Sequence, residues 1–157
     1  MKRRNFIKNT LYSSAALAST SILTNSCKAN SSKKITILHT NDVHSHIDPF
    51  DKNNEKFALK GGISRRATII EKIRNENANT LLLDAGDIFQ GTPYFNYYGG
   101  ELEFKLMSML KYDLATLGNH DFDNGIDGLY KQLPNANFNF VSANYDFKNT
   151  VLDTHVK

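Results

Sequence analysis

Three short polar segments of this sequence hold residue types that bind divalent metal ions. The first is residues 41–46 (Asn-Asp-Val-His-Ser-His), in which a carboxylate and an imidazole stand two positions apart. In an extended chain, side chains two positions apart leave the same face, so Asp42 and His44 can converge on one cation. Oxygen and imidazole ligands without a thiolate suit Mn²⁺, Zn²⁺, Co²⁺ or Mg²⁺. Alone, this spacing is a weak signal, because loops hold such pairs by chance.

The second segment is residues 84–87 (Asp-Ala-Gly-Asp). Gly86 permits a sharp turn and lets the backbone approach whatever the next carboxylate binds. Asp87 has two oxygens, so it can bridge two cations roughly 3.5–4 Å apart, as two-metal sites require. Taken alone, a Gly-Asp pair is better interpreted as a plain turn capped by the aspartate. Asp84 is interpreted as a structural residue, because it lies nearer the apolar run that precedes the segment.

The third segment is residues 117–123 (Leu-Gly-Asn-His-Asp-Phe-Asp). Asn119 offers a neutral carbonyl oxygen as a metal ligand. His120 can donate a proton or a hydrogen bond to a phosphoryl oxygen or a leaving group. Asp123 is close enough to accept a hydrogen bond from the other ring nitrogen, or it caps the helix that follows, and the two roles are compatible. Asp121 is interpreted as a surface residue.

Apolar patterning places each segment at the end of a buried strand. Short apolar runs predict strands over residues 35–39, 81–83, 114–117 and 138–143, and apolar residues at helical spacing predict helices around residues 63–73, 102–110 and 126–133. Strand and helix alternate, so the predicted fold class is α/β, with sheet and helices in layers. In such sheets ligands bind beyond the carboxyl ends of the strands, so the three segments are expected to meet. His39, within the first strand, is expected to be a buried core residue.

The first 26 residues have the layout of an export signal. A basic start over residues 2–8 precedes an uncharged, largely apolar stretch over residues 11–23. That stretch is too short to span a bilayer as a mature helix, so residues 1–26 are predicted to be a signal peptide and residues 27–34 a polar tether. Arg3-Arg4 resembles the twin-arginine signal, which exports folded proteins, and general secretion is the alternative.

Cys27 is the only cysteine in the sequence, which excludes an internal disulfide and a cysteine-based metal cluster. It stands at the end of the leader, where bacterial lipoproteins carry their lipid, and we expect lipid attachment there. The alternative is a leader removed elsewhere, with Cys27 incidental. The expected location is that of an exported bacterial protein, either periplasmic or membrane-anchored as a lipoprotein.

The charge balance argues against a nucleic-acid partner. Lys and Arg number 19 and Asp and Glu 16, for a formal charge of +3. Four of the basic residues and no acidic ones lie within residues 1–26, so the rest of the chain has 15 basic against 16 acidic residues, or −1. Nucleic-acid binding is not expected, because it needs a basic surface.

Together the three segments resemble the calcineurin-like metallophosphoesterase superfamily, whose motifs are Asp-x-His, then Gly-Asp, then Gly-Asn-His-Asp/Glu. The surrounding residues are similar to its 5′-nucleotidase branch over residues 38–44, 61–65, 84–91 and 118–123, and the similarity covers roughly residues 34–145. It implies two divalent cations and a nucleotide substrate. By this resemblance Asp42 and His44 bind the first metal, Asp87 bridges, Asn119 binds the second, and His120 and Asp123 form the catalytic pair.

The sequence departs from that family after the third segment. Members continue with a Gly-His and a Gly-His-x-His motif that complete both metal shells, and this sequence has neither. Residues 35–157 are therefore expected to form a partial layered α/β sandwich, about half of the usual domain, whose partner is the missing C-terminal half. The expected function is dinuclear-metal hydrolysis of nucleotides outside the cytoplasm, with little activity alone. The alternatives are cyclic phosphodiester, nucleotide-sugar or sulfur-ester hydrolysis on the same scaffold, or a non-catalytic lipoprotein remnant.

Overall fold

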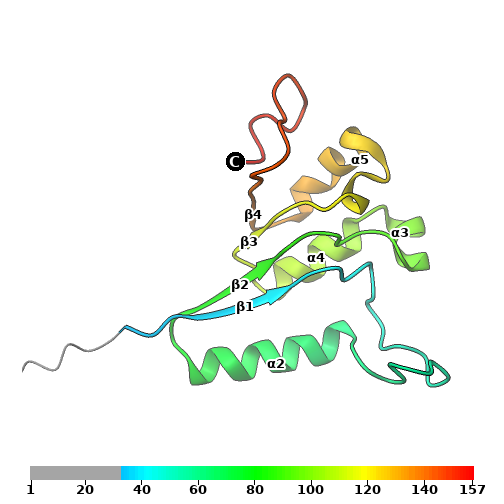
Figure 1. Ribbon diagram of the computed structural model, residues 1–157, viewed down its shortest axis with the longest axis vertical. Coiled ribbons are helices and arrows are strands. Elements are labelled where there is room, and N and C mark those ends of the chain that lie inside the picture. The colour runs from blue at the N-terminus through cyan, green and yellow to red at the C-terminus, as the bar shows by residue number, and fades with distance from the viewer. Residues whose placement is uncertain (1–32) are drawn as a thin grey trace, which may run out of the picture. The chain divides into compact units, whose positions relative to one another are not determined.

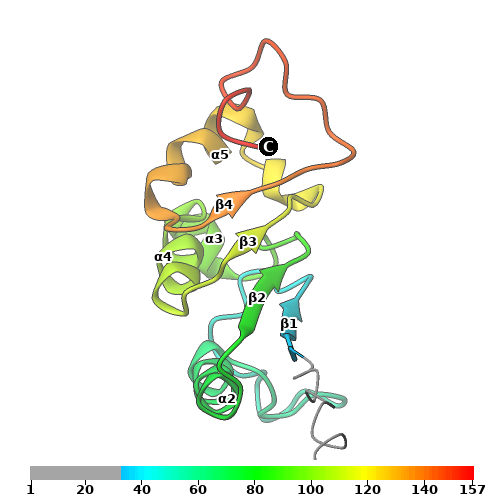
Figure 2. The same ribbon diagram turned by 90° about the vertical axis from the view of Figure 1, so that its left-hand side faces the viewer.

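The computed structural model describes residues 33–157, so the expected signal peptide, most of the tether and Cys27 lie outside the described residues. The described part is built on a parallel four-stranded sheet whose strands follow one another in sequence order (Figures 1 and 2). The strands are β1 (Thr36–Thr40), β2 (Thr80–Asp84), β3 (Leu114–Ala115) and β4 (Asn139–Phe140). The helices are α2 (Ile63–Glu76), α3 (Pro93–Tyr98), α4 (Glu101–Met109) and α5 (Gly125–Gln132), with short 3₁₀ helices η1 (His120–Phe122) and η2 (Leu133–Asn135).

Because all four strands are parallel, their carboxyl ends lie along one edge of the sheet. The longest pairing joins β1 to β2, from Thr36 opposite Thr80 to Thr40 opposite Asp84. The fold class is α/β, as predicted, and the sheet is parallel. Within residues 33–157, no helix is long and apolar enough to span a membrane.

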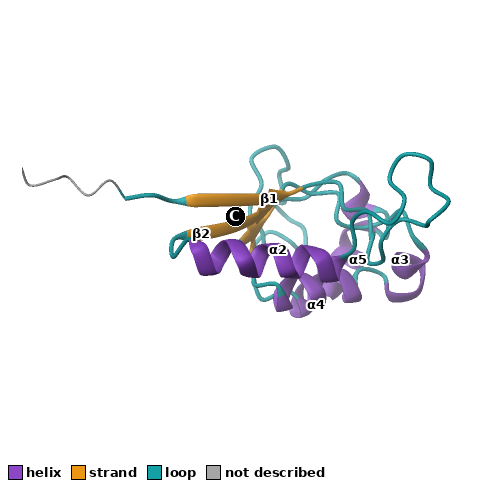
Figure 3. Ribbon diagram, turned by 90° about the horizontal axis from the view of Figure 1, so that it is seen from below, coloured by secondary structure: helices purple, strands orange, loops and turns teal. Residues whose placement is uncertain are grey.

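The core lies on one face of the sheet. Leu82, Ala115 and Phe140 are almost fully buried there, and Phe104 and Met107 of α4 belong to the same apolar cluster. Figure 3 shows α2 and α4 on the same side of the strands. Successive side chains of a strand point to opposite faces of the sheet, so every second residue packs against these helices.

The opposite face of the sheet is bare within the described residues. Ile37 is 59% exposed and Leu81, its partner in the register, is 42% exposed. Leu114 and Val141 are each 37% exposed. The prediction that His39 is a core residue is wrong: it is exposed, because it shares the face of Ile37 rather than that of Leu38.

Three elements differ from the predicted pattern. The strands predicted over residues 114–117 and 138–143 are each only two residues long in the sheet, as β3 and β4. Helix α3 was not predicted. It is short and rich in aromatic residues, it is held by Phe95 stacked on Phe89, and it ends at Gly99 in the left-handed conformation.

Candidate metal centre and catalytic pair

The loops after β1 and β2 are joined by backbone hydrogen bonds that continue the sheet's pairing. The amide of Asp42 donates to the carbonyl of Gly86 at 3.0 Å, and the amide of His44 donates to the carbonyl of Asp87 at 3.0 Å. The amide of Ser45 donates to Ile88 at 2.9 Å. Two segments more than forty positions apart in sequence are thereby fixed side by side, which brings the first two predicted metal-binding segments together.

The backbone at these residues is not extended. Asp42, His44 and Asp87 have φ values of 50°, 49° and 55°, in the left-handed region that residues other than glycine rarely adopt. The predicted convergence of Asp42 and His44 is therefore reached by a coiled loop rather than by an extended strand. Such conformations cost on the order of 1 kcal/mol or more each and cluster at functional sites.

Asp42, His44 and Asp87 form a group that fits a metal ion. One ligand atom from each residue lies within 4.8 Å of the others, and His44 Nε2 is 3.9 Å from Asp42 Oδ1. Ligand bonds of roughly 2.0–2.2 Å place the donors of one ion about 3–4 Å apart, so this spacing leaves room for a cation. His44 Nδ1 lies 3.3 Å from the carbonyl of Phe89, which leaves Nε2 as the ring nitrogen facing the group.

Asn119 is brought to Asp87 through its neighbours in sequence. The amide of His120 donates to Asp87 Oδ1 at 3.0 Å, and a Cβ added at Gly118 would lie only 2.1 Å from that oxygen. Glycine is therefore needed at position 118 for the two loops to approach. The side chain of Asn119 is exposed and makes no hydrogen bond within residues 33–157, so nothing in that range ties it directly to Asp42 or His44.

His120 and Asp123 form a hydrogen-bonded pair, with His120 Nδ1 3.1 Å from Asp123 Oδ2. The hydrogen bond to Asp123 raises the pKa of His120, and partial burial works in the opposite direction. The alternative role of Asp123 as a helix cap is not seen, because α5 begins after Asn124 without a side-chain cap. The ring of His120 lies edge-on to that of His44, with centroids 5.3 Å apart, so the pair stands beside the metal-binding group.

Asp121 is not a surface residue, contrary to the prediction. It is 1% exposed, and its carboxylate accepts hydrogen bonds from four backbone amides, those of Asp87, Ile88, Phe89 and Gly118, at 2.8–3.1 Å. Burial raises the pKa of Asp121 to about 6, while the four amides act to lower it. This one side chain ties the loop after β2 to the loop after β3. The sequence carries no signal for it, because its amide partners belong largely to another loop.

Asp84 is structural, as predicted. It is 5% exposed, and its carboxylate accepts hydrogen bonds from Thr40 Oγ1 at 2.5 Å and from the amide of Gly86 at 2.9 Å. The hydroxyl of Thr40 also lies 2.7 Å from that of Tyr112. Asp84 thus holds the turn into Asp87 and is not one of the three residues of the group.

Residues 35–157 of this chain match the calcineurin-like phosphoesterase family. The chain therefore belongs to the calcineurin-like phosphoesterase family, and within it to the 5′-nucleotidase family. It is 48% identical over 115 residues to a snake venom 5′-nucleotidase from Naja atra, covering 71% of this chain and 22% of the relative. It is 43% identical over 120 residues to a 5′-nucleotidase from Homo sapiens, covering 73% of this chain and 21% of the relative.

Solved structures agree with this placement. The 5′-nucleotidase precursor from Thermus thermophilus superimposes with a TM-score of 0.70 at 39% identity, covering 78% of this chain and 24% of that one. The NAD nucleotidase from Haemophilus influenzae gives a TM-score of 0.70 at 35% identity, covering 78% of this chain and 26% of that one. The chain spans about a fifth of the length of the curated relatives it matches.

Proposed function

We propose that residues 35–157 carry the first part of the active site of a dinuclear-metal phosphoester hydrolase that acts on nucleotides. The observation that carries this proposal is the convergence of Asp42, His44 and Asp87 from two loops, with the His120–Asp123 pair beside them. The names of the relatives support a nucleotide substrate.

The positions of these residues support a role for each. Asp42 and His44 Nε2 would hold one cation and Asp87 would be shared. Asn119, which lies next to the hydrogen bond from the His120 amide to Asp87, would offer its carbonyl oxygen to a second cation. Divalent cations in such a site lower the pKa of a bound water and offset the charge that builds on phosphoryl oxygens. Asp123 holds Nδ1 of His120, so Nε2 is the ring nitrogen that donates a hydrogen bond to the phosphoryl group.

Both metal shells are incomplete within the described residues. Three candidate His, Asp or Glu ligands converge there, and Asp87 and Asn119 alone would serve the second cation. We therefore propose weak metal binding and little hydrolysis by this chain without further residues. The export leader predicted over residues 1–26 supports a site of action outside the cytoplasm, and cell fractionation of the tagged protein tests that assignment.

A metal titration tests the proposed centre. We expect Mn²⁺ to bind the wild-type chain, and Asp87→Ala to weaken binding at least tenfold, because it removes the shared carboxylate. Asp127→Ala is the matched control, since Asp127 is an exposed aspartate of α5 away from the group. Equal Mn²⁺ binding by the wild type and Asp87→Ala would show that the half-site is not formed.

A second candidate substrate is a nucleotide with a pyrophosphate linkage. It is favoured by the likeness to the NAD nucleotidase, whose TM-score equals that of the 5′-nucleotidase precursor. A panel of AMP, NAD, cyclic nucleotides and nucleotide sugars, offered to the full-length protein, separates these substrates.

A further inference from the structure

Two polar side chains are buried without hydrogen-bond partners, one of them in the loop after β1 that carries Asp42 and His44. Ser45 is fully buried and Glu103 of α4 is 3% exposed. Neither the hydroxyl of Ser45 nor either carboxylate oxygen of Glu103 has a hydrogen-bond partner within the described residues. Buried polar groups are nearly always hydrogen-bonded, and an isolated buried carboxylate is strongly unfavourable. Two such groups in one place need a common explanation.

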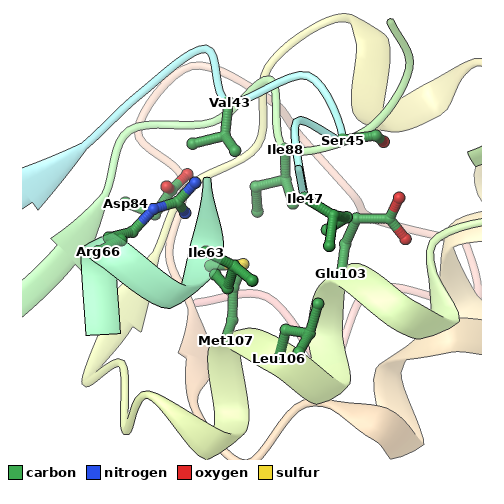
Figure 4. Close-up of a pocket in the computed structure, with 10 residues that line it drawn as sticks. All are labelled: Val43, Ser45, Ile47, Ile63, Arg66, Asp84, Ile88, Glu103, Leu106 and Met107. Carbon is green, nitrogen blue, oxygen red and sulfur yellow. The ribbon is translucent and has the colours of Figure 1, made fainter. Parts of the chain in front are cut away.

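Ser45 and Glu103 line the same small cavity, which has a free volume of about 10 Å³. Most of its other walls are apolar, formed by Val43, Ile47, Ile63, Ile88, Leu106 and Met107. Figure 4 shows the oxygens of Ser45 and Glu103 on the same side of the cavity, whereas the guanidinium of Arg66 lies beside Asp84 on the other side. A space of this size holds about one water molecule.

We propose that Ser45 and Glu103 hold one buried water between them and that both are positioning residues for the metal ligands. The water donates one hydrogen bond to the Glu103 carboxylate and a second to the Ser45 hydroxyl. This arrangement links α4 to the loop that carries Asp42 and His44, and it gives both buried groups a partner.

The link matters because the backbone of that loop is strained. Ser45 follows His44, and the two have φ values of 54° and 49°. The main chain of Ser45 is already fixed, since its amide donates to Ile88 and its carbonyl accepts from Thr92 Oγ1 at 2.8 Å. The side chain is the remaining attachment that keeps this residue, and so His44 Nε2, in place.

Replacing Glu103 separates a positioning role from a merely structural one. Glu103→Met removes the acceptor at similar volume. We expect this variant to unfold at no lower denaturant concentration than the wild type, because an apolar side chain of similar volume replaces a carboxylate that is costly to bury. We also expect its Kd for Mn²⁺ to rise about tenfold, as for other residues that orient metal ligands. Glu103→Gln, which keeps a hydrogen-bonding group, should stay within about threefold of the wild type.

Ser45→Ala completes the design. We expect it to raise the Kd for Mn²⁺ by a similar factor, and the Ser45→Ala/Glu103→Met double variant to bind no more weakly than either single one. Glu101→Met is the matched control, because Glu101 lies on the same helix with its side chain 46% exposed. Wild-type Mn²⁺ affinity in Glu103→Met, or additive losses in the double variant, would overturn the proposal.

The inference on metal positioning rests on the proposed metal site, and the two can fail separately. If the wild-type chain binds no Mn²⁺, the proposed function fails. The link between Ser45 and Glu103 is then decided by a double-mutant cycle on unfolding free energy, where linked residues give non-additive changes and independent ones add. Additive changes there would overturn the link.

Discussion

At the scale of single residues, the side chains that hold the loops together are distinct from those that present ligand atoms for a metal ion. Asp42, His44 and Asp87 present ligand atoms to one another, whereas Asp84 and Asp121 are buried and accept hydrogen bonds from the loops. The sequence predicted the first group, because their segments follow predicted strands of one sheet and together resemble the motifs of one family. It could not predict the role of Asp121, which depends on four amides brought together only by the fold.

Asp121→Asn tests this structural role. Each carboxylate oxygen of Asp121 accepts two backbone N–H groups, and an asparagine presents an NH₂ group to one of those pairs. Leaving buried donors unsatisfied costs on the order of 1–3 kcal/mol each, so we expect about 3 kcal/mol less unfolding free energy in denaturant titration. Asp127→Asn should change it by less than about 0.5 kcal/mol. An equally small change for Asp121→Asn would contradict the assignment.

The raised pKa of Asp84 should make the unfolding free energy depend on pH. Burial raises the pKa of Asp84 in the folded chain above its ordinary value of 3.8, against the hydrogen bonds from Thr40 and Gly86. The folded state then binds the proton more tightly than the unfolded state. Proton binding at Asp84 therefore contributes to the unfolding free energy. This contribution is fully present below pH 3.8 and is lost as pH rises through the pKa of Asp84 in the folded state.

Asp84→Asn cannot titrate and keeps both hydrogen bonds, because its amide can donate to Thr40 while its carbonyl accepts from Gly86. We therefore expect the stability of the variant, relative to the wild type, to increase as the pH is raised from about 3 to 7, a range that brackets the ordinary pKa of an aspartate. Denaturant unfolding at several pH values measures this difference. A relative stability that is flat with pH, or that decreases, would show that burial of Asp84 does not favour its neutral form.

At the scale of elements, the sheet has one packed face and one bare face within residues 33–157. Five predicted elements are confirmed with small shifts of their ends, namely β1, β2, α2, α4 and α5. Each of them has apolar residues repeated at the spacing of its secondary structure. Strands β3 and β4 were predicted, but their short extent and helix α3 could not be, since both depend on contacts with other elements. The same holds for His39, whose exposure depends on which face the helices cover.

The two faces respond differently to substitution. Leu82 is 1% exposed, so Leu82→Ala should lower the unfolding free energy by about 2–5 kcal/mol. Ile37 lies on the bare face, and Ile37→Thr, which stays β-branched, should change it by less than about 0.5 kcal/mol. Thermal or denaturant unfolding of the two variants measures both. A large loss from Ile37→Thr would mean that another segment covers this face in solution.

At the scale of the whole molecule, the chain spans about a fifth of its curated relatives and carries one group of three residues that could hold a metal ion. We predict that the purified 157-residue chain with Mn²⁺ releases phosphate from AMP at a rate close to that of the protein-free control. The reason is that, among the described residues, only Asp87 and Asn119 are proposed as ligands of a second cation. Phosphate release is the measurement, with a zero-protein blank and the Asp87→Ala variant as controls. Metal-dependent turnover at an ordinary enzymatic rate, on the order of 1–10³ s⁻¹, would contradict this prediction.

The most direct test of the proposed metal centre is crystallographic. Crystals of the chain soaked in Mn²⁺ and measured near the manganese absorption edge locate the ion by its anomalous scattering. We predict one peak within bonding distance of Asp42, His44 Nε2 and Asp87. A well-ordered site without that peak, or with these three side chains turned away from one another, would contradict the account.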